Sequence, residues 1–105
     1  MPRVAFRLRL RPGVIEEYER AHQNVWPELL AKLKKVGVSD YSVFRRDLDL
    51  FLVMKVDDFE RAWGILDKDP TNLRWQKEMG HLFDPITNLK PGERFPMMKE
   101  VFHLE

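Results

Sequence analysis

The chain has 105 residues, 44% of them hydrophobic and 33% charged, so we expect a single domain spanning residues 1–105 with its own apolar core. The 18 basic and 17 acidic side chains nearly cancel, which gives no electrostatic case for a nucleic-acid or membrane partner. The absence of cysteine excludes disulfides, zinc–thiolate sites and a thiol nucleophile. The first residues alternate between charged and apolar and match neither a signal peptide nor a membrane span, so we expect a cytoplasmic protein.

The first part of the chain predicts a strand followed by an interrupted helix. From Val4 to Leu10, apolar residues alternate with arginines, a period of two that is typical of a strand with one apolar face. From Val14 to Val36, apolar residues recur at three- and four-residue spacing, which predicts a helix. Pro27 lacks the N–H that a helix interior needs, so we expect a kink or a restart after Trp26.

The second part predicts a hairpin, two short helices, a loop and a strand. Tyr41–Arg45 and Leu50–Val56 resemble two strands joined by a charged turn. Asp57-Asp58 and Asp69-Pro70 are signals for the starts of the two helices. A loop is expected over residues 84–96, which is long for a compact domain unless it has a function, and a last strand over residues 97–104.

The order strand, helix, strand, strand, helices, strand is that of a ferredoxin-like β-α-β-β-α-β sandwich, an α+β fold with an antiparallel sheet. Helices would cover one face of this sheet. The other face must be covered by something else, often a second copy of the sheet.

Four residues stand out as candidates for chemistry. Tyr18 and His22 are four residues apart on the apolar face of the first helix, and both can exchange protons or hydrogen bonds. Tyr41 and Trp75 carry flat aromatic rings on which the C–H face of a sugar can lie. Spacing alone favours the simpler interpretation, which is two satisfied polar residues at the core edge and two ordinary core aromatics.

Other candidate sites have less support. His81 and His103 are isolated and show no metal-ligand spacing, so no metal is expected. The arginines that alternate along the first strand could bind an anion, but a solvated or salt-bridged sheet surface is the preferred interpretation. These arginines are Arg3, Arg7, Arg9 and Arg11.

Several stretches together resemble the L-rhamnose mutarotase family, over essentially the whole chain. The most specific are the Tyr-x-x-x-His-x-x-x-Trp-Pro-Glu run that begins at Tyr18 and the Glu-Val-Phe-His-Leu end that begins at Glu100. Ser39-Asp40-Tyr41-Ser42 and Arg74-Trp75 add to the similarity.

The resemblance implies a dimeric α/β-barrel type of ferredoxin-like fold and exchange of the α and β anomers of a deoxyhexose, most simply L-rhamnose, without a cofactor. It implies that His22 is the catalytic acid/base with Tyr18 as its partner, and that Tyr18, Tyr41 and Trp75 line the sugar site. Gln76 stands where rhamnose members carry a second tryptophan. We expect Gln76 to hydrogen-bond a sugar hydroxyl, and L-fucose is an alternative substrate.

Two other functions are consistent with the same pattern. One is a dimeric ferredoxin-like monooxygenase or haem-binding protein that uses His22 or His81, which haem titration would reveal through a Soret band. The other is a non-catalytic module that binds a sugar without accelerating anomer exchange.

The resemblance and the charge balance together set the expected partners. These are a monosaccharide and a second copy of the chain, with no nucleic acid and no membrane.

Overall fold

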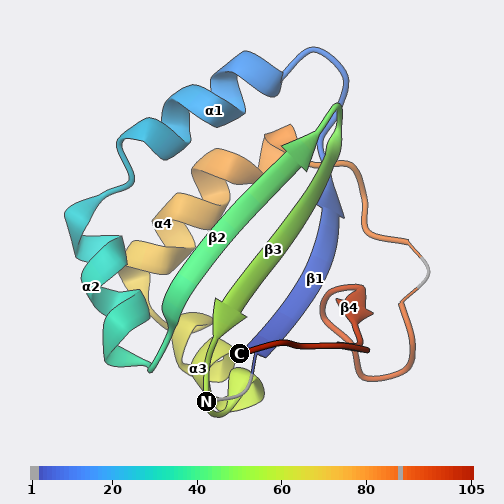
Figure 1. Cartoon of the computed structure of the whole chain (residues 1–105). Helices are drawn as coiled ribbons and strands as arrows, with labels where there is room; N and C mark the ends of the chain where they lie inside the picture. Colours follow the sequence, from blue (N-terminus) through green and yellow to red (C-terminus); the bar gives the residue numbers. More distant parts are fainter. Residues whose placement is uncertain (1–2, 88) are drawn as a thin grey trace.

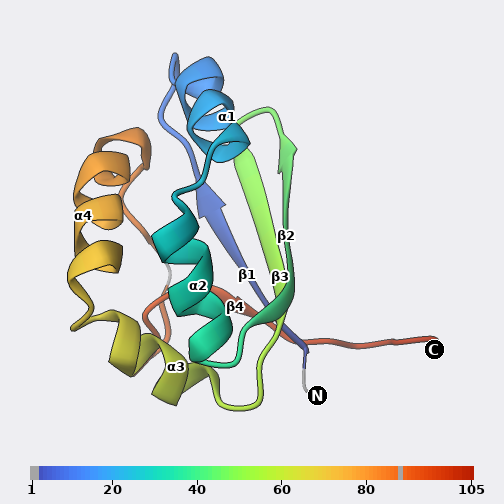
Figure 2. The same cartoon turned by 90° about the vertical axis from the view of Figure 1, so that its left-hand side faces the viewer.

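The computed structural model describes residues 3–87 and 89–105. Over these residues, four antiparallel strands form one sheet in the order β2-β3-β1-β4, and the helices all lie on one of its faces (Figures 1 and 2). The strands are β1 (Arg3–Arg9), β2 (Ser39–Arg46), β3 (Asp49–Lys55) and β4 (Met97–Met98). The helices are α1 (Ile15–Gln23), α2 (Pro27–Lys35), α3 (Phe59–Leu66), α4 (Pro70–Met79) and the 3-10 turn η1 (Gly80–Leu82). The expected ferredoxin-like order is confirmed.

The core lies between the helices and the sheet, because strand alternation sends every second side chain to that face. In β3, Leu50, Leu52 and Met54 are at most 5% exposed. In β1, Phe6 lies opposite Leu52 in the antiparallel register and is equally buried. The intervening residues of both strands point to the opposite face, which carries no helix (Figure 2).

The predicted helix break falls at Pro27, as expected. Trp26 has φ −55° and ψ 129°, which is outside the helical region, and Pro27 is the first residue of α2. Proline is favoured there because the first N–H of a helix has no partner within the helix. The break separates α1 from α2, so His22 stands near the end of a short helix and Tyr18 one turn earlier.

The predicted caps of the last two helices are also confirmed. Asp58 Oδ1 accepts a hydrogen bond from the backbone N–H of Arg61 at 3.0 Å. Asp69 Oδ1 accepts from the N–H groups of Thr71 and Asn72 at 2.9 and 3.1 Å. The pKa of Asp69 lies below its ordinary value, first because of the Asn72 bond. These caps fix the start of α4, the helix that carries Trp75.

The predicted final strand over residues 97–104 is largely wrong. Only Met97–Met98 pair with β1, and residues 99–105 extend away from the body as a tail (Figures 1 and 2). The reason is that β1 begins at Arg3, which binds Glu100 at 3.0 Å, so no residue of the described chain lies opposite the end of the tail. Val101, Phe102 and Leu104 are 79–87% exposed.

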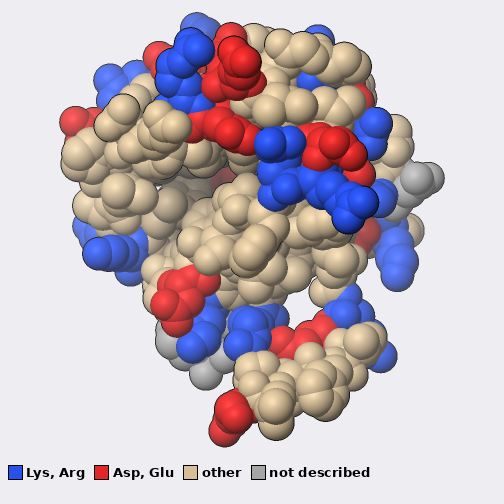
Figure 3. Space-filling view, turned by 45° about the horizontal axis from the view of Figure 1, so that its top comes forward, with Lys and Arg blue, Asp and Glu red and all other residues tan. Residues whose placement is uncertain are grey.

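The open face of the sheet has an uncharged centre (Figure 3), and Arg7, which pairs with Phe51, borders it. Phe44 and Phe51 lie opposite each other there, and Ala5 pairs with both Val53 and Met98. Basic and acidic side chains are interspersed around this area rather than gathered by sign (Figure 3). None of the described helices has the length and apolar character needed to cross a membrane.

Candidate active site

A cavity of about 420 Å³ lies between the helix layer and the sheet. This volume is within the range of roughly 300–1,000 Å³ that is typical of small-molecule sites. The cavity is lined by all five residues that the sequence suggested, namely Tyr18, His22, Tyr41, Trp75 and Gln76. They come from α1, β2 and α4, so the fold brings together side chains that are far apart in the chain.

The orientation of His22 is set by the backbone of its own helix. Its Nδ1 lies 3.0 Å from the carbonyl oxygen of Tyr18, one turn earlier. A carbonyl oxygen can only accept, so in this bond Nδ1 carries the proton and donates it. In the neutral ring the lone pair is then on Nε2, the nitrogen that this bond leaves available.

Aromatic rings hold the imidazole on two sides. The Tyr18 ring stacks on His22 with centroids 4.2 Å apart, and Trp75 meets it edge to face at 5.6 Å. Tyr18 and Trp75 are 5% and 8% exposed. Both rings are therefore fixed by packing, and this fixes the imidazole ring between them.

The two tyrosine hydroxyls remain protonated far above neutral pH. Burial raises the pKa of Tyr18 to about 12. The pKa of Tyr41 is also raised, first by burial of its hydroxyl and then by the negative charge that Tyr18 would carry. Tyr41 as a whole residue is 36% exposed at the sheet edge, although its hydroxyl is buried. Both phenols can thus donate hydrogen bonds to a ligand at neutral pH.

The loop after η1 forms a wall of this cavity, although its role could not be assigned from the sequence. Asp84, Ile86 and Phe95 line the cavity. The loop is held at its end by Phe95, which stacks on Phe6 with centroids 4.4 Å apart and planes at 9°. Arg94 adds an ion pair of 2.9 Å to Asp67. Asn88, within the expected loop, lies outside the described residues.

Phe83, Trp63 and Phe95 are site residues that the sequence reasoning missed. Phe83 meets the Tyr18 ring edge to face at 5.9 Å, and Trp63 and Phe95 also line the cavity. For Phe83 and Phe95 the available signal was an aromatic residue beside or inside the long loop, whereas Trp63 in α3 follows the ordinary pattern of a core residue.

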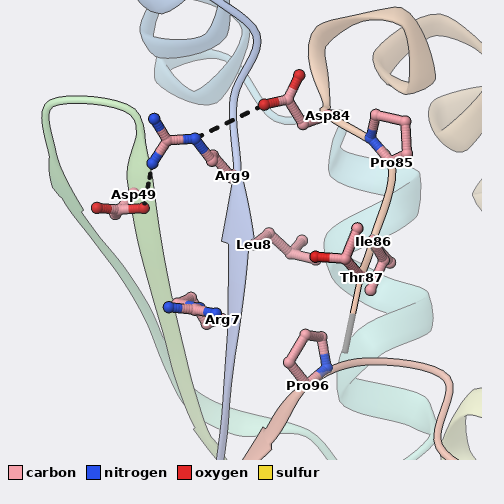
Figure 4. Close-up of a pocket in the computed structure, with 9 residues that line it drawn as sticks. All are labelled: Arg7, Leu8, Arg9, Asp49, Asp84, Pro85, Ile86, Thr87 and Pro96. Atoms are coloured by element: carbon pink, nitrogen blue, oxygen red, sulfur yellow. Dashed lines mark hydrogen bonds and ion pairs between the residues drawn. The ribbon is translucent and has the colours of Figure 1, made fainter. Parts of the chain in front are cut away.

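Two further hollows adjoin this cavity. One, of about 340 Å³, lies between α2 and β2 and shares His22, Tyr41 and Trp75 with it. The other, of about 440 Å³, lies between β1 and the loop and contains none of the suggested site residues (Figure 4). We therefore assign the candidate active site to the cavity that holds all five.

The hollow in Figure 4 shows what the strand arginines do. Arg9 binds Asp49 at 3.0 Å and Asp84 at 3.6 Å. With the Arg3–Glu100 pair, this confirms the interpretation of a salt-bridged sheet surface for these two arginines. Arg11 was wrongly grouped with them. The strand ends at Arg9, and Arg11 Nε instead donates to the Phe83 carbonyl at 2.8 Å and lines the candidate active site.

The other two histidines lie elsewhere. His81 Nε2 contacts Glu17 at 2.8 Å on the surface, and His103 is in the exposed tail. Within residues 3–87 and 89–105, no group of three or more His, Cys, Asp or Glu side chains is placed to hold a metal ion.

The fold and the cavity define a class: a small ferredoxin-like protein with a histidine and aromatic rings in a pocket of small-molecule size. Comparison with known proteins gives the family. The L-rhamnose mutarotase family model matches residues 3–104. A relative from Acidiphilium cryptum, named L-rhamnose mutarotase, is 37% identical over 99% of both chains. The chain therefore belongs to the L-rhamnose mutarotase family, whose members are anomer-interconverting isomerases.

Solved structures agree with this assignment. An L-rhamnose mutarotase from Formosa agariphila superposes with a TM-score of 0.77 at 28% identity and full coverage of both chains. A tetracenomycin F2 cyclase from Streptomyces glaucescens superposes with a TM-score of 0.68 at 16% identity, covering 100% of this chain and 98% of the cyclase. The second likeness shows the fold alone, because one fold supports many chemistries.

Proposed function

We propose that the protein interconverts the α and β anomers of L-rhamnose, with His22 as the acid/base. The observation that supports this most directly is the hydrogen bond from His22 Nδ1 to the Tyr18 carbonyl, which leaves Nε2 of this cavity-lining residue available as a base. Family membership supports the sugar and the reaction.

The reaction opens the sugar ring and closes it on the other face of the aldehyde. Nε2 of His22 takes the proton of the anomeric hydroxyl, the bond between C1 and the ring oxygen breaks, and C1 becomes the aldehyde. The ring oxygen gains a proton, either from the imidazolium or through the Tyr18 hydroxyl. Rotation of the aldehyde and the reverse steps give the other anomer. Histidine suits both directions because its ordinary pKa is near neutrality.

The remaining residues bind the sugar. The Trp75 ring offers an apolar surface to ring C–H groups, and the hydroxyls of Tyr18 and Tyr41 donate to sugar oxygens. Gln76 is exposed at the rim of the same cavity, where its amide can bind a hydroxyl. This polar rim is the reason to keep L-fucose as a second candidate sugar.

We also propose that the active form is a homodimer. The uncharged centre of the open face includes Phe44, which is 60% exposed, and Met98, which is 47% exposed. The tail residues Val101 and Phe102 are apolar and leave the body on the side of the open face (Figure 2). Contiguous exposed apolar surface of this kind is typical of an interface. A second copy would cover both the sheet face and the tail.

Saturation-transfer NMR on L-rhamnose and L-fucose tests the proposed reaction. The wild-type protein is expected to accelerate anomer exchange of L-rhamnose most, with L-fucose second. Binding of L-rhamnose without faster exchange would instead support the non-catalytic sugar-binding module.

A further inference from the structure

Arg11 belongs to the active site, although it was expected on the open face of the sheet. It lines the same cavity as His22 and Tyr18. Two hydrogen bonds hold Arg11 in place. Its backbone N–H donates to the Leu82 carbonyl at 2.8 Å, and its side-chain Nε donates to the Phe83 carbonyl at 2.8 Å. Arg11 is exposed to solvent, and the bond from its Nε holds the side chain against the wall of the cavity.

The backbone around Arg11 strengthens this placement. Leu10 and Phe83 form an antiparallel bridge, and the Asp84 N–H donates to the Arg9 carbonyl at 2.9 Å. Leu10 is fully buried. The end of β1 and the start of the loop are thus one rigid unit, and Arg11 projects from it.

The guanidinium retains unused donors. An arginine has five N–H donors, and one of them is used by the Phe83 carbonyl. Among the described residues, no carboxylate is within ion-pair distance of Arg11, in contrast to Arg9, which has two. The remaining donors are available to oxygen atoms of a ligand in the cavity.

Arg11 and His22 line the same cavity, and a series of contacts through Tyr18 and Phe83 connects them. His22 stacks on Tyr18 at 4.2 Å, Tyr18 meets Phe83 at 5.9 Å, and the Phe83 carbonyl holds Arg11. A sugar in this cavity whose anomeric hydroxyl contacts His22 has other oxygen substituents that can reach Arg11.

We propose that Arg11 is a substrate-binding residue that donates hydrogen bonds to oxygen substituents on the sugar carbons opposite C1. It does not exchange protons, because an arginine stays charged in proteins. This inference rests on the proposed function and adds a specificity determinant: sugars with more oxygen at that end of the ring bind better, and an anionic group there binds best.

The test uses Arg11→Gln, with Arg20→Gln on the exposed side of α1 as a matched loss of charge that lines none of the cavities described above. Anomer exchange is measured by saturation-transfer NMR for L-rhamnose and for L-mannose, which differs only by a hydroxyl on C6. Arg11→Gln is expected to raise KM about tenfold, the loss of one good hydrogen bond to a charged donor, with kcat changed less than KM. Arg20→Gln is expected to leave both parameters unchanged.

The outcomes separate the two proposals. A KM increase for both sugars assigns Arg11 to a ring hydroxyl, and an increase for L-mannose alone assigns it to the C6 oxygen. An unchanged KM for both sugars, in a variant that folds like the wild type, overturns the role of Arg11 while leaving the mutarotase reaction intact. A wild-type protein that accelerates neither sugar overturns the proposed function itself.

Discussion

His22 and Tyr18 are joined twice: their rings stack at 4.2 Å, and His22 Nδ1 donates to the Tyr18 carbonyl at 3.0 Å. The first contact fixes the plane of the imidazole and the second fixes which nitrogen carries the proton. Because both partners are on one helix turn, the arrangement depends on the backbone of α1 rather than on a flexible side-chain partner. The backbone of α1 therefore sets the tautomer of His22 in which the lone pair is on Nε2.

Replacing Tyr18 by phenylalanine separates the two roles of that residue. The backbone carbonyl and the ring stack remain, so the orientation of His22 should be kept. If the hydroxyl relays the proton to the ring oxygen, the exchange rate falls by about 10²-fold or more. If it only hydrogen-bonds the sugar, KM rises and kcat changes little. Saturation-transfer NMR at several sugar concentrations measures both, and full wild-type kinetics would exclude either role.

The tyrosine hydroxyls should ionise unusually late. The chain has two tyrosines, Tyr18 and Tyr41, and burial raises the pKa of both, that of Tyr18 to about 12. Near-ultraviolet absorbance should therefore show little phenolate at pH 10 in the folded protein, whereas the protein in guanidinium chloride titrates near the ordinary value of about 10. A folded protein in which one tyrosine ionises near pH 10 would contradict the burial of that hydroxyl.

The same pKa values predict how stability depends on pH. The folded state holds the two tyrosine protons more tightly than the unfolded state does. The stability that the two hydroxyls contribute is therefore fully present below about pH 10. It is lost as the pH rises from about 10 toward 12, because the unfolded chain releases the protons first. Urea unfolding at a series of alkaline pH values measures this loss, and a Tyr18→Phe variant should lose less over the same range.

Truncating Phe95 should loosen the loop wall of the cavity. Phe95→Ala removes the ring that stacks on Phe6 and is expected to cost about 2 kcal/mol of unfolding free energy, since the site is only partly buried. Because the loop lines the active site, KM for L-rhamnose should rise as well. Ile65→Ala, at a residue 45% exposed on α3, is the control and should change neither quantity much. An unchanged KM in Phe95→Ala would show that the loop does not shape the site.

The dimer proposal predicts that a charge on the open face separates the subunits. Phe44→Asp places a carboxylate in the uncharged centre, where a second copy would bury it unpaired. Size-exclusion chromatography with light scattering should show a dimer for the wild type and a monomer for this variant. Leu73→Asp, at a comparably exposed residue on α4, should remain dimeric. A monomeric wild type would contradict the proposal.

Local patterns predicted much of this molecule. The spacing of Tyr18 and His22 placed them on one helix face, and Pro27 marked the break between α1 and α2. Period-two alternation identified which side of β3 is buried. These features depend on residues close in sequence, so the sequence pattern contains them.

Contacts between distant segments could not be predicted in the same way. The stack of Phe95 on Phe6 and the bond from Arg11 to Phe83 join residues more than seventy positions apart. Period-two spacing grouped Arg11 with the open-face arginines because it cannot show where a strand ends. It also gave the tail a strand pattern, although the described chain offers the end of that segment no neighbour with which to pair.

A comparison of three proteins tests whether His22 is the acid/base of anomer exchange. Saturation-transfer NMR on L-rhamnose is run with wild type, His22→Gln and His81→Gln, the last replacing a surface histidine outside the cavity. Circular dichroism confirms that all three are folded. We expect His22→Gln to lose about 10²–10⁴-fold of the exchange rate and His81→Gln to keep the wild-type rate. A folded His22→Gln protein with the wild-type exchange rate would contradict the acid/base role of His22.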